Sequence, residues 1–147
     1  MIKRLTLLDL SDLMNVEKDC FEDPYQAKQY EYELADNPCA YLYGYYKDDN
    51  LIGFIDYWVT FDTTQLCKIG VLEAYRQQQI ATELMDFMYE EAIKENCETI
   101  LLEVRASNQI ARSFYEREGF LEINVRKDYY SNPSEDAIVM GKILVGM

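Results

Sequence analysis

Residues 70–92 read GVLEAYRQQQIATELMDFMYEEA, and the fold can be worked out from this stretch outward. It combines the apolar end of a strand, a short polar turn and the start of a helix with one apolar face. The first N–H groups of such a helix have no backbone partner, so its N-terminus commonly binds phosphate. Glutamines stand at 77–79, however, where a phosphate-binding loop usually has glycines. The stretch therefore predicts either a diphosphate site or an ordinary helix start.

Alternating strand and helix patterns continue on both sides of this stretch. Apolar residues at near-helical spacing predict helices at 9–20, 25–35, 79–95 and 107–119. Apolar and β-branched runs bounded by turn residues predict strands at 2–7, 40–47, 50–61, 63–71, 98–104, 121–130 and 137–144. The resulting order, β-α-α-β-β-β-α-β-α-β-β, predicts an α+β layer fold.

Two of these elements are expected at the centre of the core. Strand 98–104 is almost wholly apolar, which implies a buried central strand. Helix 79–95 is expected to turn inward Ile80, Leu84, Met85, Met88 and Ile93. In the next helix, Ser107 or Asn108 is the expected cap and Gly119 the expected end.

Length and hydropathy limit the class of protein. A chain of 147 residues is long enough for one domain, residues 1–147, and too short for two ordinary ones. No apolar run approaches the ~18 residues of a membrane span. The first ten residues, MIKRLTLLDL, turn polar too early for a signal peptide. We therefore expect a cytoplasmic protein that does not bind membranes.

Charge limits the partners. The chain has 27 acidic and 14 basic residues, a formal net charge of −13. A negative surface repels nucleic acid and favours a cationic partner or substrate, although many acidic surfaces serve solubility alone.

The absence of histidine limits the chemistry. The four cysteines, Cys20, Cys39, Cys67 and Cys97, have no CxxC spacing. Together these facts exclude most zinc sites and every histidine-based triad, and we expect no metal. We expect reduced thiols, since a redox role would need a low-pKa thiolate and only Cys67 lies near a motif. Acid–base chemistry is left to Glu, Asp, Tyr, Lys or Cys.

Four segments carry a resemblance to a known family. They are IGVLEAYRQQQIATELM (69–85), LLEVRASNQIARSFYEREGF (101–120), RKDYY (126–130) and EDAIVM (135–140). They resemble the GNAT family of acetyl-CoA-dependent N-acetyltransferases, and within it the RimI-type ribosomal-protein-alanine N-acetyltransferases. The resemblance covers nearly the whole chain. It implies a single GNAT domain with a mixed, mostly antiparallel sheet of about seven strands, helices on both faces, acetyl-CoA as co-substrate and no metal.

The resemblance also implies how acetyl-CoA is held. In the family's diphosphate motif, Q/R-x-x-G-x-G/A, Arg76 takes the first position, Gln79 replaces the first glycine and Ala81 takes the last. The implied cofactor-binding residues are Ile69, Gly70, Val71, Arg76, Gln77, Gln78, Gln79, Ile80, Ala81, Thr82 and Asn108. A diphosphate binds backbone N–H groups, so Gln79 is compatible with the site if its φ is negative and its side chain points to solvent. An ordinary helix start is the alternative.

Two residues match the family's acid–base pair. Glu103 resembles the general base, and an α-amine with a reference pKa of roughly 7.7–8.0 loses its proton to a carboxylate with modest effort. Tyr115 matches the residue that protonates the departing thiolate of CoA. A surface carboxylate and a core aromatic are the structural alternatives.

Aromatic residues flank the expected acceptor groove. Phe21 and Tyr25 resemble an early family element that borders the groove, although both could be core residues. Tyr129 and Tyr130 would close the other side, unless they belong to a plain hairpin loop. The resemblance implies a monomer that acetylates the N-terminal alanine on the basic tail of the eighteenth protein of the small ribosomal subunit. Lysine or small-amine acetylation, or non-catalytic CoA binding, are the alternatives.

Overall fold

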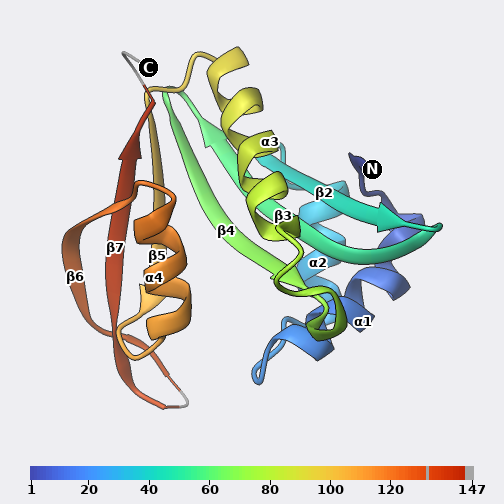
Figure 1. Ribbon diagram of the computed structural model, residues 1–147, viewed down its shortest axis with the longest axis horizontal. Helices are drawn as coiled ribbons and strands as arrows, with labels where there is room; N and C mark the ends of the chain where they lie inside the picture. The colour runs from blue at the N-terminus through green and yellow to red at the C-terminus, as the bar shows by residue number, and fades with distance from the viewer. Residues whose placement is uncertain (132, 145–147) are drawn as a thin grey trace.

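A single sheet organises the computed structural model, which describes residues 1–131 and 133–144 (Figure 1). In these residues the sheet has seven strands in the order β1-β2-β3-β4-β5-β7-β6. Their bounds are Ile2–Arg4 (β1), Ala40–Lys47 (β2), Asn50–Thr60 (β3), Thr63–Val71 (β4), Thr99–Arg105 (β5), Leu121–Tyr130 (β6) and Glu135–Ile143 (β7). Only β4 and β5 pair in parallel. The expected mixed, mostly antiparallel sheet is confirmed.

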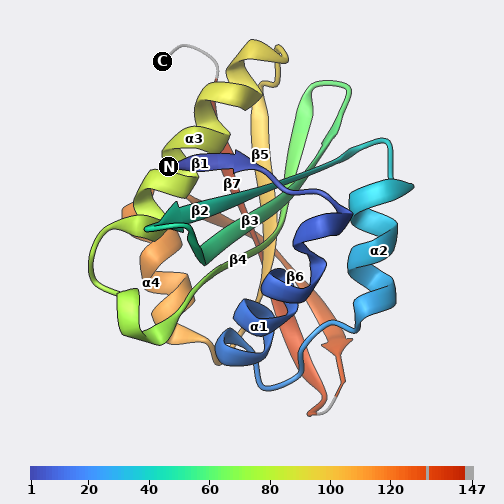
Figure 2. The same cartoon turned by 90° about the vertical axis from the view of Figure 1, so that its right-hand side faces the viewer.

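Helices cover both faces of the sheet (Figures 1 and 2). Their bounds are Leu10–Cys20 (α1), Ala27–Ala35 (α2), Ile80–Lys94 (α3) and Gln109–Arg117 (α4). Helices α1 and α2 enclose a core cluster with Leu42 and Phe54 on one face, while α3 packs with Ile52 and Ile55 on the other. In the described part of the chain, no helix is long and apolar enough to cross a membrane. The α+β fold and the expected element order are confirmed.

The first strand is shorter than the predicted 2–7. It ends at Arg4, and a short 3-10 helix follows at Leu7–Asp9. The Thr6 N–H donates to the Asp9 carboxylate at 2.8 Å, which forms a cap that ends the extended chain. A second 3-10 helix, Glu73–Tyr75, also escaped prediction.

Two expectations about burial are also corrected. Ile93 is 51% exposed and Ala92 is buried in its place. Position 92 follows Met88 by four residues and so shares its side of α3, whereas position 93 turns about 100° further. Strand β5 is central, but its side chains alternate between buried and half-buried. The side chains of β5 that lie on the same side as Leu101 are therefore only half-buried.

A β-bulge interrupts the pairing of β3 with β4. Asp56 pairs with Lys68 and Tyr57 with Leu66, so Cys67 is an extra residue in β4. Because a bulge breaks the alternation of side chains, Cys67 and Lys68 both turn towards α1 and α2.

The parallel pairing of β4 with β5 stops at the same point. It runs from Thr63 and Thr99 to Leu66 and Leu102 and includes no later residue of either strand. Figure 1 shows the two strands separating beyond this point. The β5-facing edge of β4 is therefore left without a strand partner from Cys67 onward.

A buried ion pair ties the helices to β4. Glu17 of α1 is fully buried and accepts a hydrogen bond from the Lys68 ammonium. It also accepts from the Tyr30 hydroxyl at 2.5 Å and from the Tyr25 N–H at 2.7 Å. The Lys68 ammonium lies 4.1 Å from the centroid of the Phe21 ring and 3.5 Å from that of Tyr25. One buried carboxylate thus joins α1, the segment 21–26, α2 and β4.

Two glutamines at the start of α3 adopt left-handed backbone conformations. Gln79, the N-cap, has φ 64° and ψ 17°, and Gln77 has φ 65°. The condition of a negative φ at Gln79 is therefore not met. A left-handed conformation costs a residue with a Cβ roughly 1–2 kcal/mol, a cost that glycine avoids. Gln79 thus retains the backbone that the family's glycine would favour.

Replacing Lys68 by Met should destabilise the protein by about 3–5 kcal/mol, because Glu17 would remain buried without its cation. Urea unfolding at neutral pH measures this loss as a lower midpoint. Adding Glu17→Gln to Lys68→Met should recover part of it. Lys94→Met removes an exposed pair with Glu91 and should hardly move the midpoint. A wild-type midpoint for Lys68→Met would show that the ion pair does not hold the helices.

Replacing Gln79 by Gly should raise the free energy of unfolding by about 0.5–1 kcal/mol, because relief of the left-handed strain exceeds the extra freedom of glycine in the unfolded chain. Gln78→Gly is the matched control, since the backbone at Gln78 is not among those with positive φ. It should lower stability. Equal losses for both variants in thermal unfolding would mean that the Gln79 side chain makes a stabilising contact.

Candidate active site

The N-terminus of α3 presents a row of free backbone donors. In the residues that the structure describes, no group accepts a hydrogen bond from the N–H groups of residues 77–82. The side chains of Gln77, Gln78 and Gln79 are exposed. Successive N–H groups at the positive end of a helix dipole form an anion-binding site. The structure therefore brings together the predicted loop residues, including Ile80, Ala81 and Thr82.

Arg76 secures this loop to the end of β4. Its Nε donates to the carbonyl oxygen of Val71 at 3.0 Å. The Cys20 thiol donates to the same oxygen at 3.3 Å. Arg76 therefore makes a structural hydrogen bond whether or not a ligand is bound.

The end of β4 offers an unpaired strand edge to an extended ligand. Ile69, Gly70 and Val71 pair with β3 on one side and with no strand on the other. A Cβ at Gly70 would lie only 3.1 Å from the Cys20 sulfur, so glycine permits the close approach of α1. A free edge of this kind can pair with amide groups of a ligand as an added strand would.

Helix α4 carries two of the predicted residues. Asn108 is its N-cap, and the Asn108 Oδ1 accepts from the Ala111 N–H at 3.1 Å. The Asn108 amide nitrogen donates no hydrogen bond within the described residues, and it can contact a cofactor while Oδ1 caps the helix. Tyr115 is half-buried, with its ring centroid 5.5 Å from that of Phe114 and 5.8 Å from that of Phe120. Burial raises the pKa of the Tyr115 hydroxyl, which keeps it protonated.

Glu103 is the first residue of β5 beyond its pairing with β4. Its side chain is 20% exposed and accepts from Arg126 Nη1 at 2.8 Å. Arg126 comes from β6 and crosses β7 at Ala137, its paired residue there. The contact gives the Glu103 carboxylate a defined orientation. Arg126 was not predicted as a site residue, although it begins the RKDYY segment (126–130) that carries part of the resemblance.

The predicted acceptor residues form two groups. Phe21 and Tyr25 are half-buried and pack against the core cluster under α1 and α2, as the core alternative predicts, and their place beside the acceptor groove stays a prediction. The centroids of Tyr129 and Tyr130 lie 5.0 Å apart in an edge-on pair. Burial, together with the charge of Glu103, raises the pKa of Tyr130 to about 12. The 21–26 segment and the β6–β7 hairpin lie at the same end of the molecule (Figures 1 and 2).

Cys67 lies beside this region but is not a reactive thiolate. Burial and the nearby Asp56 carboxyl raise the pKa of its thiol. The condition for a redox role, a low thiol pKa, is not met.

Comparison with known proteins places the chain and its fold in a family. The sequence matches the model of the acetyltransferase (GNAT) family over residues 10–120. A Bacillus subtilis protein, named provisionally as a ribosomal protein bS18-alanine N-acetyltransferase, is 29% identical over 95% of this chain and 92% of its own. The Haemophilus ducreyi ribosomal protein bS18-alanine N-acetyltransferase is 33% identical over 68% of this chain and 71% of its own.

Among solved structures, the ribosomal-protein-S18-alanine N-acetyltransferase from Escherichia coli is similar along the chain. It superposes with a TM-score of 0.89 at 27% identity, covering 98% of this chain and 93% of that one. The chain therefore belongs to the GNAT acetyltransferase family, and it is an acetyl-CoA-dependent N-acetyltransferase.

Proposed function

We propose that the enzyme transfers the acetyl group of acetyl-CoA to the N-terminal α-amine of a protein, the N-terminal alanine of ribosomal protein bS18. One observation carries the proposal. The similarity to a relative named for that activity extends over 139 residues, 95% of the chain. It is therefore not confined to the loop at 76–82 that any acetyl-CoA-dependent enzyme of the family needs.

Acetyl-CoA would lie across three elements. Its diphosphate would bind the free N–H groups of residues 77–82 at the start of α3. Its pantetheine arm would pair with the open edge of β4 at Ile69, Gly70 and Val71, with the Asn108 amide nearby. A backbone N–H of that edge would polarise the thioester carbonyl. The acetyl group would then reach the region where β4 and β5 separate.

Glu103 and Tyr115 would carry the proton transfers. The neutral amine attacks the thioester carbon, so a C–N bond forms and the C–S bond breaks. Glu103, oriented by Arg126, takes the amine proton directly or through a water. Tyr115 donates its hydroxyl proton to the departing thiolate, and its raised pKa keeps that proton in place beforehand. The reaction uses no covalent enzyme intermediate.

The acceptor would enter from the end of the molecule at which the 21–26 segment and the β6–β7 hairpin both lie. Phe21 and Tyr25, from the segment between α1 and α2, would border one side of its N-terminus, and Tyr129 and Tyr130, from the end of β6, the other. A net charge of −13 favours a basic tail over an acidic one, mainly through faster association. The enzyme would act on this tail as a monomer.

A short basic peptide that begins with Ala should gain one acetyl group when it is incubated with acetyl-CoA and the enzyme. Fragmentation mass spectrometry should place the group on the α-amine, whose pKa lies about two units below that of a lysine amine. The same peptide with a blocked N-terminus is the control and should remain unmodified. Acetylation of its lysines instead would contradict the proposed acceptor.

Glu103→Gln and Tyr115→Phe should each lower kcat by roughly 10²–10⁴-fold, the usual contribution of a general base or acid, with little change in acetyl-CoA affinity. Raising the pH should partly rescue Glu103→Gln, because more of the amine is then already neutral. Tyr115→Phe should show no such rescue, since its defect lies in protonating the thiolate.

Matched controls separate these effects from damage to the fold. Glu122→Gln changes a β6 carboxylate paired with Arg112, and Tyr32→Phe changes an exposed tyrosine of α2. Both should retain wild-type kcat. Wild-type rates for Glu103→Gln and Tyr115→Phe from pH 6 to 9 would assign both residues a structural role only.

A further inference from the structure

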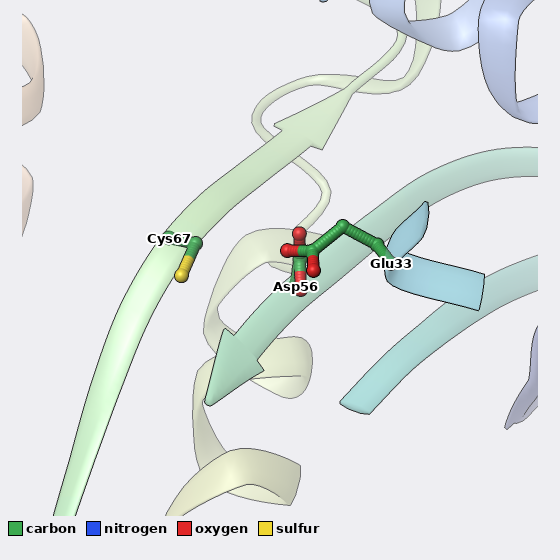
Figure 3. A group of neighbouring side chains, drawn as sticks. All are labelled: Glu33, Asp56 and Cys67. Carbon is green, nitrogen blue, oxygen red and sulfur yellow. The ribbon is translucent and has the colours of Figure 1, made fainter. Parts of the chain in front are cut away.

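Three potential metal ligands from three different elements meet on the α2 face of the sheet. They are Glu33 of α2, Asp56 of β3 and Cys67 of the β4 bulge, and Figure 3 shows their side chains gathered together. One ligand atom from each lies within 4.8 Å of the other two. The bulge brings Cys67 and Lys68 onto this face together.

Asp56 is the most deeply buried carboxyl of this cluster. Its exposure is 0%, and within the described residues no N–H or hydroxyl group donates to either of its oxygens, so only a proton shared with the neighbouring Glu33 carboxyl could satisfy them from within the protein. A buried carboxylate without a partner costs several kcal/mol. The fold must therefore supply either a proton or a cation at this position.

Glu33 is already oriented towards the same point. Its Oε1 accepts from Trp58 Nε1 at 2.7 Å, and its Oε2 accepts from Asn37 Nδ2 at 2.6 Å. Donors behind a carboxylate fix its orientation in the way that outer-shell partners do in metal sites. Each Glu33 oxygen retains a further lone pair for a ligand bond.

Protein cations do not neutralise this pair of carboxylates. Among the described residues, no lysine or arginine forms an ion pair with Glu33 or Asp56. Lys68 is close by, but its ammonium is bound by Glu17. Two acidic side chains thus share one buried region without a protein countercharge.

We propose that Glu33, Asp56 and Cys67 bind one divalent cation of the Zn²⁺ class, which displaces the thiol proton of Cys67 to solvent as it binds. Two oxygens and one sulfur favour zinc over Mg²⁺ or Ca²⁺, which prefer oxygen ligands alone. Tetrahedral bonds of about 2.0–2.3 Å would bring the ligand atoms to roughly 3.5 Å from one another, so small side-chain movements suffice. A fourth position stays open to water. The cation would fasten α2 to the bulge of β4 and has no part in the acetyl transfer proposed above.

The test measures retained metal on the full chain. Protein stripped with EDTA is equilibrated with one equivalent of Zn²⁺, desalted and analysed by elemental mass spectrometry. Wild type should retain about one Zn²⁺ per chain and gain roughly 5–10 °C in Tm when free Zn²⁺ is a hundredfold above Kd. Asp56→Asn and Cys67→Ser should each lose stoichiometric retention.

Co²⁺ provides a second readout that depends on the thiolate. Wild type loaded with Co²⁺ should show thiolate-to-metal charge-transfer absorption, which Cys67→Ser should abolish. Cys20→Ser is the matched control, because Cys20 contacts the Val71 carbonyl and lies outside the cluster. It should keep both the retained Zn²⁺ and the Co²⁺ spectrum.

Wild type that retains no Zn²⁺ after desalting would overturn the proposal. So would variants at Asp56 and Cys67 that bind as wild type does. A proton shared between Asp56 and Glu33 would then account for the buried pair. Neither readout uses acetyl transfer, so the result is independent of the proposed acceptor and of its catalytic residues.

Discussion

The short ladder between parallel strands β4 and β5 is the constraint on which the site depends. The two strands pair only from Thr63 and Thr99 to Leu66 and Leu102. On β4, the next residue is the bulged Cys67, and on β5 it is Glu103. Three features therefore lie at the same level of the sheet: the start of the open edge of β4, the Glu103 carboxylate and the Cys67 bulge. A longer ladder would pair the open edge of β4 and would extend past Glu103 on β5.

The buried Glu17–Lys68 ion pair stabilises the part of the candidate site formed by α1, the 21–26 segment and α2. Glu17 gathers donors from Lys68, Tyr30 and the Tyr25 backbone, and so fixes the segment that carries Phe21. Since a carboxylate buried without these partners would be strongly unfavourable, the arrangement persists as a unit. Phe21 and Tyr25, which are proposed to border the acceptor, are therefore held in place by the Glu17–Lys68 ion pair as well as by apolar packing.

Local pattern predicted the element order, whereas the roles of Glu103 and Tyr115 were predicted from the motifs that resemble the family. It could not predict features that depend on which strands pair and in which register. The Arg126 contact with Glu103 crosses β7, and the Cys67 bulge exists only relative to β3. The positive φ of Gln79 could not be predicted for another reason. A glycine would have signalled a positive φ, whereas glutamine does so rarely.

The order of strands divides the sheet into two parts that are each continuous in sequence. Strands β1 to β4 come from residues 2–71, and β5, β7 and β6 come from residues 99–143. A chain cut in the turn after α3, where Asn96 has φ 61°, would leave each part with its own antiparallel ladder. Reassociation of the two fragments would rebuild the four β4–β5 pairs and, with them, the open edge beside Glu103. Fragment complementation would therefore report directly on assembly of the catalytic region.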